Sequence, residues 1–446
     1  MLTDLAPSPR LRHSSGDRLQ QLLTGRYADP QTGSLAAIET RSLVIADSIK
    51  GDEVELVRAL GFGRKLAVIS DPATTDVLGR RIEAALAGTY QVQSLQLPAD
   101  PHADDATVER LRTAARHADA FIAVGSGTIN DLTKYTSALE GKPYAVFATA
   151  PSMNGYVSLT ASITVHGHKS TLQAQPPTGA FFDLRVLAAA PKRMIRAGIG
   201  DSICRSTAQA DWLLSHRLLG TDYRELPFDL LRDDEAQLIE HAEALVHGDL
   251  EAMRTLTRTL LLSGFGTAIV GSSAPASQAE HLVSHYIDML SPASRPPILH
   301  GEQIAVTTLS VARAQHALFS GPAPVVVADT EDDAVIAKRF GPELAPSVLE
   351  EFAHKRLDQT RADALNHRIA RDWDDVRAEV LGVLLPLATI ETTLKKAGAP
   401  LTPADISLER GFYEQALLHA REIRNRFTVL DLAAASGRLT PMLSSL

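Results

Sequence analysis

Four side chains suited to metal chemistry lie between residues 201 and 300: Asp201, His281, His285 and His300. One carboxylate and two imidazoles make a good site for zinc or a similar divalent ion. Three protein ligands leave a tetrahedral ion one open position, which can take a substrate oxygen. His281 and His285 share one helix face because they are four residues apart. A chain with 15 histidines also produces such a pair by chance, so the residues alone leave both a metal site and ordinary packing open.

A second histidine pair, His166 and His168, flanks Gly167 in a polar stretch. Alternation along an extended chain points both side chains the same way. We interpret these two histidines as solvated residues of a turn.

A glycine turn, Gly125-Ser126-Gly127, follows the apolar run 121–124 and leads into a helical pattern. Glycines without Cβ let backbone N–H groups approach a pyrophosphate, and the positive end of the following helix favours its charge. The turn therefore indicates a nucleotide site. The third glycine of the usual dinucleotide fingerprint is absent, so an ordinary strand-to-helix turn remains the alternative.

The elements around these residues change character along the chain. Short apolar runs alternate with amphipathic helical patterns in the first half, which predicts βαβ units and a mostly parallel sheet. The clearest predicted strands are 65–70, 91–97, 121–124 and 144–148, with crossover helices at 75–87 and 106–118. Alternation over 159–165 and 170–174 around Gly167 predicts a β-hairpin. After Pro191 the chain is predicted to be helical, with stretches at 201–219, 234–262, 376–397 and 411–425.

The length of 446 residues predicts two large domains, and 45% hydrophobic residues suffice to bury both. The predicted division is an N-terminal arm at 1–38, a dinucleotide-binding α/β domain at 39–190 and a helical metal-binding domain at 191–446. The polar arm is predicted either to be partly disordered or to pack on a partner subunit.

The charge and the cysteine content indicate which binding partners and which cellular compartment to expect. The formal net charge of −9 argues against nucleic acid, and a small-molecule substrate is expected instead. The single cysteine, Cys204, excludes an intrachain disulfide framework and fits the reducing cytoplasm. No segment resembles a signal peptide, and no uncharged apolar run is long enough for membrane insertion.

Four separated segments together resemble one family. The sequence is similar to the sn-glycerol-1-phosphate dehydrogenases, within the superfamily of glycerol dehydrogenases, metal-dependent (iron-containing) alcohol dehydrogenases and dehydroquinate synthases. The segments are 125–131, 149–156, 190–201 and 280–302, and the resemblance covers roughly residues 40–310.

The resemblance implies an α/β N-terminal dinucleotide-binding domain, an all-α C-terminal domain and an active site in the cleft between them. It implies NAD(P)(H) as the cofactor, and a homodimer. The residues implied to bind the cofactor are Gly125, Gly127, Thr128, Asn130, Asp131, Thr149, Ser152 and Ser158.

For the metal, the resemblance implies Asp201, His281 and His300 as ligands, and His285 as a substrate contact or proton relay. Zinc is favoured, with nickel or iron as alternatives. The implied reaction reduces dihydroxyacetone phosphate to sn-glycerol 1-phosphate, with the ion acting as a Lewis acid on the substrate oxygen. The cofactor preference is open because Asp71, after the strand at 65–70, is as well explained as a cap.

One residue departs from the family pattern. The family usually has aspartate where this chain has Asn154, a position expected to touch substrate together with Asp201 and His285. An amide cannot carry negative charge, so a related polyol or polyol phosphate is an alternative substrate. A dehydroquinate-synthase-like cyclase and a non-catalytic descendant are further alternatives, disfavoured by Asp201 and by the complete ligand set. Candidates for binding the substrate phosphate are Arg193, Arg196 and Arg205.

Overall fold

The computed structural model describes residues 17–165, 168–292 and 295–443. The chain divides into two compact units, the first formed by 1–198 and 225–271 and the second by 199–224 and 272–446. It therefore passes from one unit to the other three times. The boundary predicted at residue 190 lies near the first passage, whereas composition does not indicate that 225–271 returns to the first unit.

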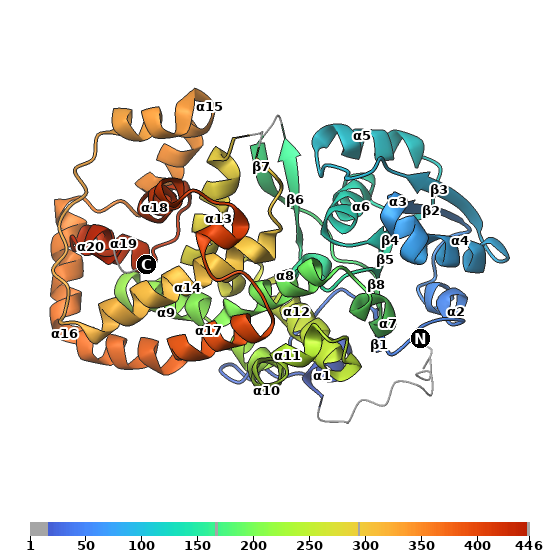
Figure 1. Cartoon of the computed structure of the whole chain (residues 1–446), viewed down its shortest axis with the longest axis horizontal. Coiled ribbons are helices and arrows are strands. Elements are labelled where there is room, and N and C mark those ends of the chain that lie inside the picture. Colours follow the sequence, from blue (N-terminus) through green and yellow to red (C-terminus); the bar gives the residue numbers. More distant parts are fainter. Residues whose placement is uncertain (1–16, 166–167, 293–294, 444–446) are drawn as a thin grey trace. The chain divides into compact units, whose positions relative to one another are not determined.

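A six-stranded parallel sheet forms the centre of the first unit (Figure 1). Its strands, in chain order, are β1 (Ser42–Ala46), β2 (Lys65–Ser70), β3 (Gln91–Gln96), β4 (Ala120–Gly125), β5 (Tyr144–Ala148) and β8 (Gly179–Asp183). They are arranged β1-β8-β5-β4-β2-β3, and every neighbouring pair is parallel. The predicted parallel sheet and the four predicted strands are confirmed. β1 and β8 are not among the strands that the sequence analysis predicts.

The burial of the strands explains their composition. β4, β5 and β8 are buried along their whole length, whereas the edge strand β3 is largely exposed. One apolar core joins the sheet to α2 (Glu53–Arg58) and α4 (Arg80–Ala87). In addition, α6 (Gly127–Glu140) packs on β4, and α5 (Asp105–Ala114) packs on α6. Interior strands of a covered parallel sheet need no polar face, which is why they consist of continuous apolar runs.

The predicted hairpin is confirmed. β6 (Thr160–Val165) and β7 (His168–Gln173) pair antiparallel, apart from the main sheet. Residues 166–167 lie outside the described residues, and the side chain of His168 is not described either. The interpretation of His166 and His168 as solvated turn residues therefore stays a prediction.

Three helices return to the first unit: α10 (Leu226–Glu240), α11 (Ala242–Leu245) and α12 (Leu250–Val270). The helical stretch predicted over 234–262 is divided in the structure among these three helices. The chain breaks at Gly248, whose φ of 80° lies in the left-handed region. Asp249 then caps α12 by accepting a hydrogen bond from the backbone N–H of Ala252 at 2.8 Å.

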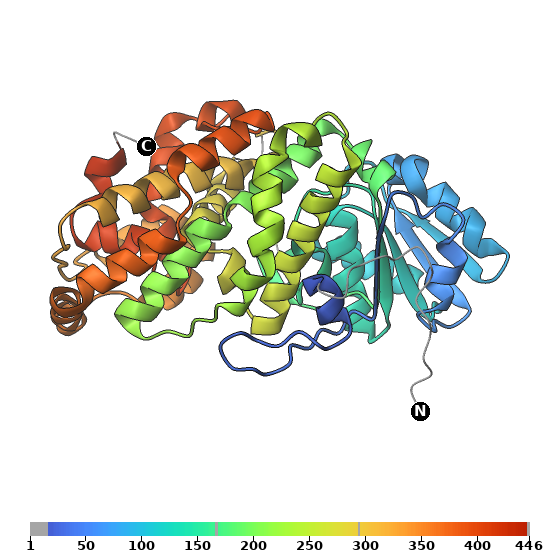
Figure 2. The same cartoon turned by 90° about the horizontal axis from the view of Figure 1, so that it is seen from below.

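The second unit is helical among its described residues, as predicted, and its helices appear in green to red in Figure 2. A further helix, α8 (Lys192–Ile203), passes from the first unit into the second. The other main helices are α9 (Arg205–Leu219), α13 (Ala279–Leu290), α14 (His300–Ser320), α15 (Asp333–Ala353), α16 (Gln359–Val383), α17 (Leu387–Lys396), α18 (Arg410–His419), α19 (Val429–Ala435) and α20 (Leu439–Leu443). A large apolar core is formed by residues of these helices other than α8 and α17. In the part of the chain that is described, no helix is both long and apolar enough to cross a bilayer.

The described part of the N-terminal arm contacts its own chain. Within it, α1 (Arg18–Leu23) buries Leu19 and Leu22. Asp17 pairs with Arg258 of α12 at 2.8 Å, and the Tyr27 hydroxyl donates to Asp229 of α10 at 2.6 Å. The arm therefore packs on its own chain from residue 17 onward, whereas residues 1–16 lie outside the described residues, and both predictions for the arm stay predictions.

Candidate active site

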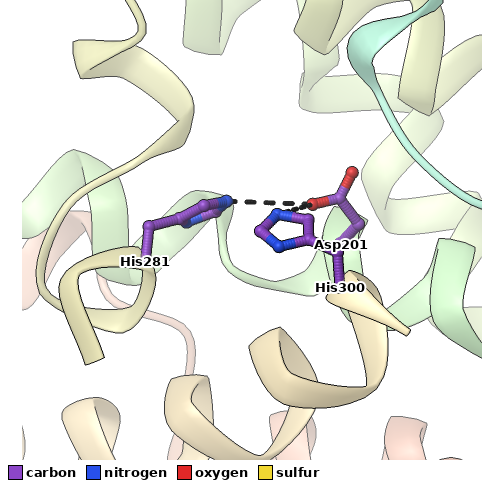
Figure 3. A group of neighbouring side chains, drawn as sticks. All are labelled: Asp201, His281 and His300. Atoms are coloured by element: carbon purple, nitrogen blue, oxygen red, sulfur yellow. Dashed lines mark ion pairs between the residues drawn. The ribbon is translucent and has the colours of Figure 1, made fainter. Parts of the chain in front are cut away.

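Asp201, His281 and His300 come together in the second unit (Figure 3). Asp201 lies near the end of α8, His281 is the third residue of α13, and His300 is the first residue of α14. Asp201 Oδ1 lies 3.9 Å from His281 Nε2 and 3.7 Å from His300 Nε2. The side chains of Asp201 and His281 are 1% and 7% exposed, whereas that of His300 is 33% exposed. The group is thus buried on one side and open on the other.

These distances suit a shared ion better than direct hydrogen bonds. Both exceed the usual 2.7–3.2 Å between hydrogen-bonded heavy atoms. Ligand atoms held at 2.0–2.2 Å by one tetrahedral ion lie roughly 3.3–3.6 Å apart, so the two distances from Asp201 lie close to this range. One carboxylate oxygen and two imidazole nitrogens are ligands that zinc, nickel and iron accept. The residues therefore fit a divalent metal.

A close backbone approach places Asp201 beside His300. A Cβ added to Gly200 of α8 would lie 2.0 Å from the carbonyl oxygen of Gly301 in α14. No side chain fits in that space, so the two helices touch through their backbones. Because Asp201 and His300 adjoin these glycines in the sequence, their side chains start from neighbouring backbone positions.

A side-chain clamp joins the two helices that carry the histidines. Ser284 of α13 donates to Gln303 Oε1 of α14 at 2.7 Å, and Gln303 Nε2 donates to Asp288 at 2.8 Å. Ser284 follows His281 by three residues, and Gln303 follows His300 by three. The clamp therefore sits about one helical turn beyond both histidines and fixes the spacing of the two helices.

The second nitrogen of His281 also has a partner. Nδ1 lies 3.0 Å from Glu280 Oε1, and Glu280 is fully buried. Burial lowers the pKa of His281 to about 4, so the imidazole is neutral near pH 7, as metal binding requires. Burial likewise raises the pKa of Glu280 to about 7.

His285 lies beside the group without belonging to the three-residue cluster. Its ring centre is 6.2 Å from that of His281 and 6.4 Å from that of His300. The distances place its imidazole within reach of a small molecule bound at the ligands. Its predicted role in substrate contact or proton relay stays a prediction.

In the first unit, the glycine turn joins β4 to α6 as predicted. Neither glycine has a positive φ. A Cβ at Gly125 would lie 2.5 Å from the Ile129 side chain, whereas one at Gly127 would lie 3.1 Å from Met153 Sδ. The N-cap residue, Ser126, makes no side-chain capping bond, so the first N–H groups of α6 are not capped by it. This arrangement is compatible with an anion at the helix start.

Two predicted cofactor residues, Asp131 and Ser158, also hold the neighbouring chain in place, and their contact with the cofactor stays a prediction. Asp131 Oδ2 accepts a hydrogen bond from the Ser162 backbone N–H at 3.0 Å. Ser158 Oγ lies 3.1 Å from Lys134 Nζ, which also donates to the carbonyl oxygens of Gly155 at 2.5 Å and Thr160 at 3.0 Å. Lys134 is fully buried, and burial lowers its pKa. The sequence analysis assigns no role to Lys134. The feature that could have indicated one is its position in the same helix, one turn after Asp131.

The remaining predicted cofactor residues lie near this turn. The Thr149 backbone N–H donates to the Gly125 carbonyl at 3.1 Å, and Ser152 hydrogen-bonds the Tyr156 side chain. Asn130 is fully buried, with its Oδ1 3.5 Å from the Tyr144 hydroxyl. Thr128 lies in the first turn of α6. Cofactor contact by these residues stays a prediction.

Asn154 is held against α12. Its Nδ2 donates to Ser263 Oγ at 3.1 Å. A Cβ on the next residue, Gly264, would lie 2.5 Å from the Asn154 carbonyl oxygen. The start of the same loop also lies against α8, since a Cβ on Gly198 would lie 1.8 Å from the Pro151 carbonyl oxygen. Backbone contacts therefore fix the loop that carries Asn154.

The three candidate arginines differ in their surroundings. Arg205 donates to Gln209 Oε1 at 2.6 Å, one turn along α9. Arg196 has a buried Nε that meets no hydrogen-bond partner among the described residues. Arg193 is exposed near the start of α8. These surroundings do not distinguish one of the three arginines as the ligand of the substrate phosphate.

Comparison with known proteins gives the class. The family model for iron-containing alcohol dehydrogenases matches residues 44–191. A glycerol dehydrogenase from Schizosaccharomyces pombe has a similar fold, with a TM-score of 0.62 at 16% identity over 91% of this chain and 90% of that one. An alcohol dehydrogenase from Oenococcus oeni gives a TM-score of 0.61 at 15% identity, covering 91% and 98%. The solved structures show the fold, and the relatives in sequence, which are glycerol-1-phosphate dehydrogenases, place the chain among the oxidoreductases that act on CH–OH groups.

Sequence relatives narrow the class further. The glycerol-1-phosphate dehydrogenase (NAD(P)+) of Thermococcus kodakarensis is 35% identical over 61% of this chain and 77% of its own length. Its namesake from Geobacillus thermodenitrificans is 31% identical, covering 82% and 86%. The protein of the same name from Bacillus velezensis is 29% identical over 92% and 95%. The chain belongs to the glycerol-1-phosphate dehydrogenase family.

Proposed function

We propose that this protein is an NAD(P)-dependent, divalent-metal-dependent dehydrogenase that interconverts dihydroxyacetone phosphate and sn-glycerol 1-phosphate. The observation that carries the proposal is the group of Asp201, His281 and His300, buried on one side and accessible at His300. The names of the relatives support the substrate and the cofactor.

In this proposal the ligand residues hold the metal, and zinc is the ion we favour. A bound divalent ion supplies Lewis acidity toward the substrate oxygen. His281 offers Nε2 as a neutral imidazole because burial lowers its pKa to about 4. His285 is proposed to contact the substrate or relay its proton, since its ring lies next to both ligand histidines.

The cofactor is proposed to bind at the glycine turn of the first unit. Its nicotinamide supplies the hydride acceptor or donor. The uncapped start of α6 is proposed to receive the pyrophosphate, with Asp131 and Lys134 fixing the segment 155–162 beside it. The functional division at residues 38 and 190, the homodimer and the cytoplasmic location remain proposals.

Asn154 motivates a second candidate, a dehydrogenase for a related polyol or polyol phosphate. Because residue 154 is asparagine, no carboxylate is present at this position to accept hydrogen bonds from substrate hydroxyls. The amide donates a hydrogen bond to Ser263. The two candidates share the ligands and the cofactor, and they differ only in the substrate.

The test is NADH and NADPH oxidation by zinc-loaded protein with dihydroxyacetone phosphate. Unphosphorylated dihydroxyacetone serves as the substrate control, and chelator-treated protein as the metal control. Chelator-sensitive turnover of the phosphate alone is the expected result. Turnover of other carbonyl compounds alone would favour the second candidate, and turnover that survives the chelator would contradict the metal dependence.

A further inference from the structure

A buried carboxylate, that of Glu280, contacts one of the proposed metal ligands, His281. Glu280 precedes His281 in α13, and its Oε1 lies 3.0 Å from His281 Nδ1, while Nε2 of the same ring faces Asp201. The glutamate is fully buried, so solvent does not compete for this contact. Glu280 thus meets the imidazole on the edge away from the other two ligands.

The surroundings of Glu280 supply donors. Its Oε1 accepts from the Gln278 backbone N–H at 2.8 Å. Its Oε2 lies 3.3 Å from the Thr207 hydroxyl, which donates to the Cys204 carbonyl oxygen at 2.8 Å. Together with the imidazole, two N–H groups therefore converge on Oε1, an arrangement suited to an oxygen that accepts.

We propose that Glu280 is a positioning residue for the metal centre: its carboxylate holds the His281 proton on Nδ1 and directs the Nε2 lone pair toward Asp201 and His300. A neutral imidazole carries its proton on one nitrogen only, so a fixed acceptor at Nδ1 selects the tautomer that leaves Nε2 free to bind. The same contact fixes the ring plane and raises the basicity of Nε2. This inference rests on the proposed function.

The chain offers a matched control at Glu422. That residue is also fully buried in the second unit and lies 2.9 Å from the Nδ1 of a histidine, His419. His419 lies outside the Asp201 cluster, in a separate group with Glu331 and Glu422 that could also hold a metal ion, so the comparison concerns zinc affinity at the Asp201 cluster. A general effect of removing a buried glutamate next to a histidine should therefore appear in Glu422→Gln as well.

The experiment measures zinc affinity by chelator competition, with thermal unfolding as the check on folding. Relative to wild type, we expect Glu280→Gln to bind Zn²⁺ about 10-fold more weakly and Glu280→Ala about 100-fold more weakly. Glu422→Gln should bind as wild type does. In ¹⁵N-histidine NMR spectra of the metal-free protein, the His281 Nδ1–H tautomer should dominate in wild type and give way to a mixture in Glu280→Ala.

Each alternative result has a distinct meaning. Wild-type zinc affinity in a folded Glu280→Gln variant would overturn the proposal, and this variant decides if Glu280→Ala does not fold. An equal loss in Glu422→Gln would also overturn it by showing a non-specific effect. Zinc binding without turnover of dihydroxyacetone phosphate in wild type would reject the proposed substrate and leave the role of Glu280 standing. A wild-type protein that binds no zinc would reject both.

Discussion

The metal-ligand cluster and the glycine turn differ in how the chain assembles them. The cluster collects single residues from positions 201, 281 and 300, whereas the turn is one segment in which a strand runs directly into a helix. The cluster depends on contacts between distant helices, such as the Ser284–Gln303 hydrogen bond. The turn depends mainly on its own neighbours in sequence.

The glycines of the two regions show the same difference. At Gly200 an added Cβ would meet a backbone oxygen at 2.0 Å, while at Gly127 it would meet the flexible end of Met153 at 3.1 Å. A side-chain end can move, but the backbone of a packed helix cannot do so without moving its neighbours. A small residue is therefore a strict requirement at the assembled site and a weaker one at the local site.

The largest effect on zinc binding and activity is expected from Gly200→Ala. The added methyl group would push α8 away from α14 and separate Asp201 from His300. We expect loss of zinc binding and activity, with destabilisation of about 1–3 kcal/mol from overpacking. Zinc titration and chemical denaturation measure the two effects. Normal zinc affinity in this variant would show that the close approach does not control the cluster.

The next comparison lies within the cluster, between His281→Ala and His285→Ala. His281→Ala should lose zinc and activity together, because it removes a proposed ligand. His285→Ala should keep the metal and lose turnover on the order of 100-fold or more, as expected for a proton-transfer group. Metal analysis and kcat separate the two roles. Wild-type kinetics in His285→Ala would show that the role of His285 is limited to packing.

Lys134→Met tests the region of the glycine turn. It keeps the buried stem and removes the ammonium group that serves the carbonyls of Gly155 and Thr160. Leaving these acceptors without their donor should cost roughly 2–4 kcal/mol and raise the KM for NAD(P)H. Zinc affinity should remain unchanged. Denaturation measures the stability, steady-state kinetics the KM, and zinc titration the metal affinity. A fall in zinc affinity as well would show that the glycine-turn region and the metal-ligand cluster are not independent.

Gly127→Ala should be milder. Because the added methyl group meets only Met153, stability should change by less than about 0.5–1 kcal/mol. If the cofactor pyrophosphate approaches this backbone closely, NAD(P)H affinity should still fall. Fluorescence titration of NADH measures that affinity. Full affinity would place the pyrophosphate elsewhere.

Asn154→Asp should have the smallest effect on the fold. The change preserves shape, and the Ser263 hydroxyl can donate to a carboxylate as well as accept from an amide. We expect stability within about 0.5 kcal/mol of wild type and a changed KM for dihydroxyacetone phosphate. Equal KM values for both proteins would exclude Asn154 from substrate discrimination.

The same contrast explains what the sequence revealed. Local patterns were enough to predict β2 to β5, the hairpin and the glycine turn, because each is encoded in adjacent residues. The grouping of Asp201, His281 and His300 came from family resemblance, because helix packing joins positions that no local pattern connects. The roles of Gly200 and Lys134 depend on the distance to residues elsewhere in the chain, so periodicity alone could not identify them. The break at Gly248 was missed because one glycine inside a helical pattern is compatible with either a helix or a turn.

The path of the chain between its two compact units limits how the protein can be divided experimentally. Residues 225–271 belong with 1–198, although the stretch 199–224 of the other unit separates them in sequence. A gene cut once, near codon 190 or 198, would yield an N-terminal fragment without α10 to α12 and a C-terminal fragment with those helices deprived of their partners. Expression trials of the isolated nucleotide unit should instead join residue 198 to 225 through a designed linker and stop after residue 271.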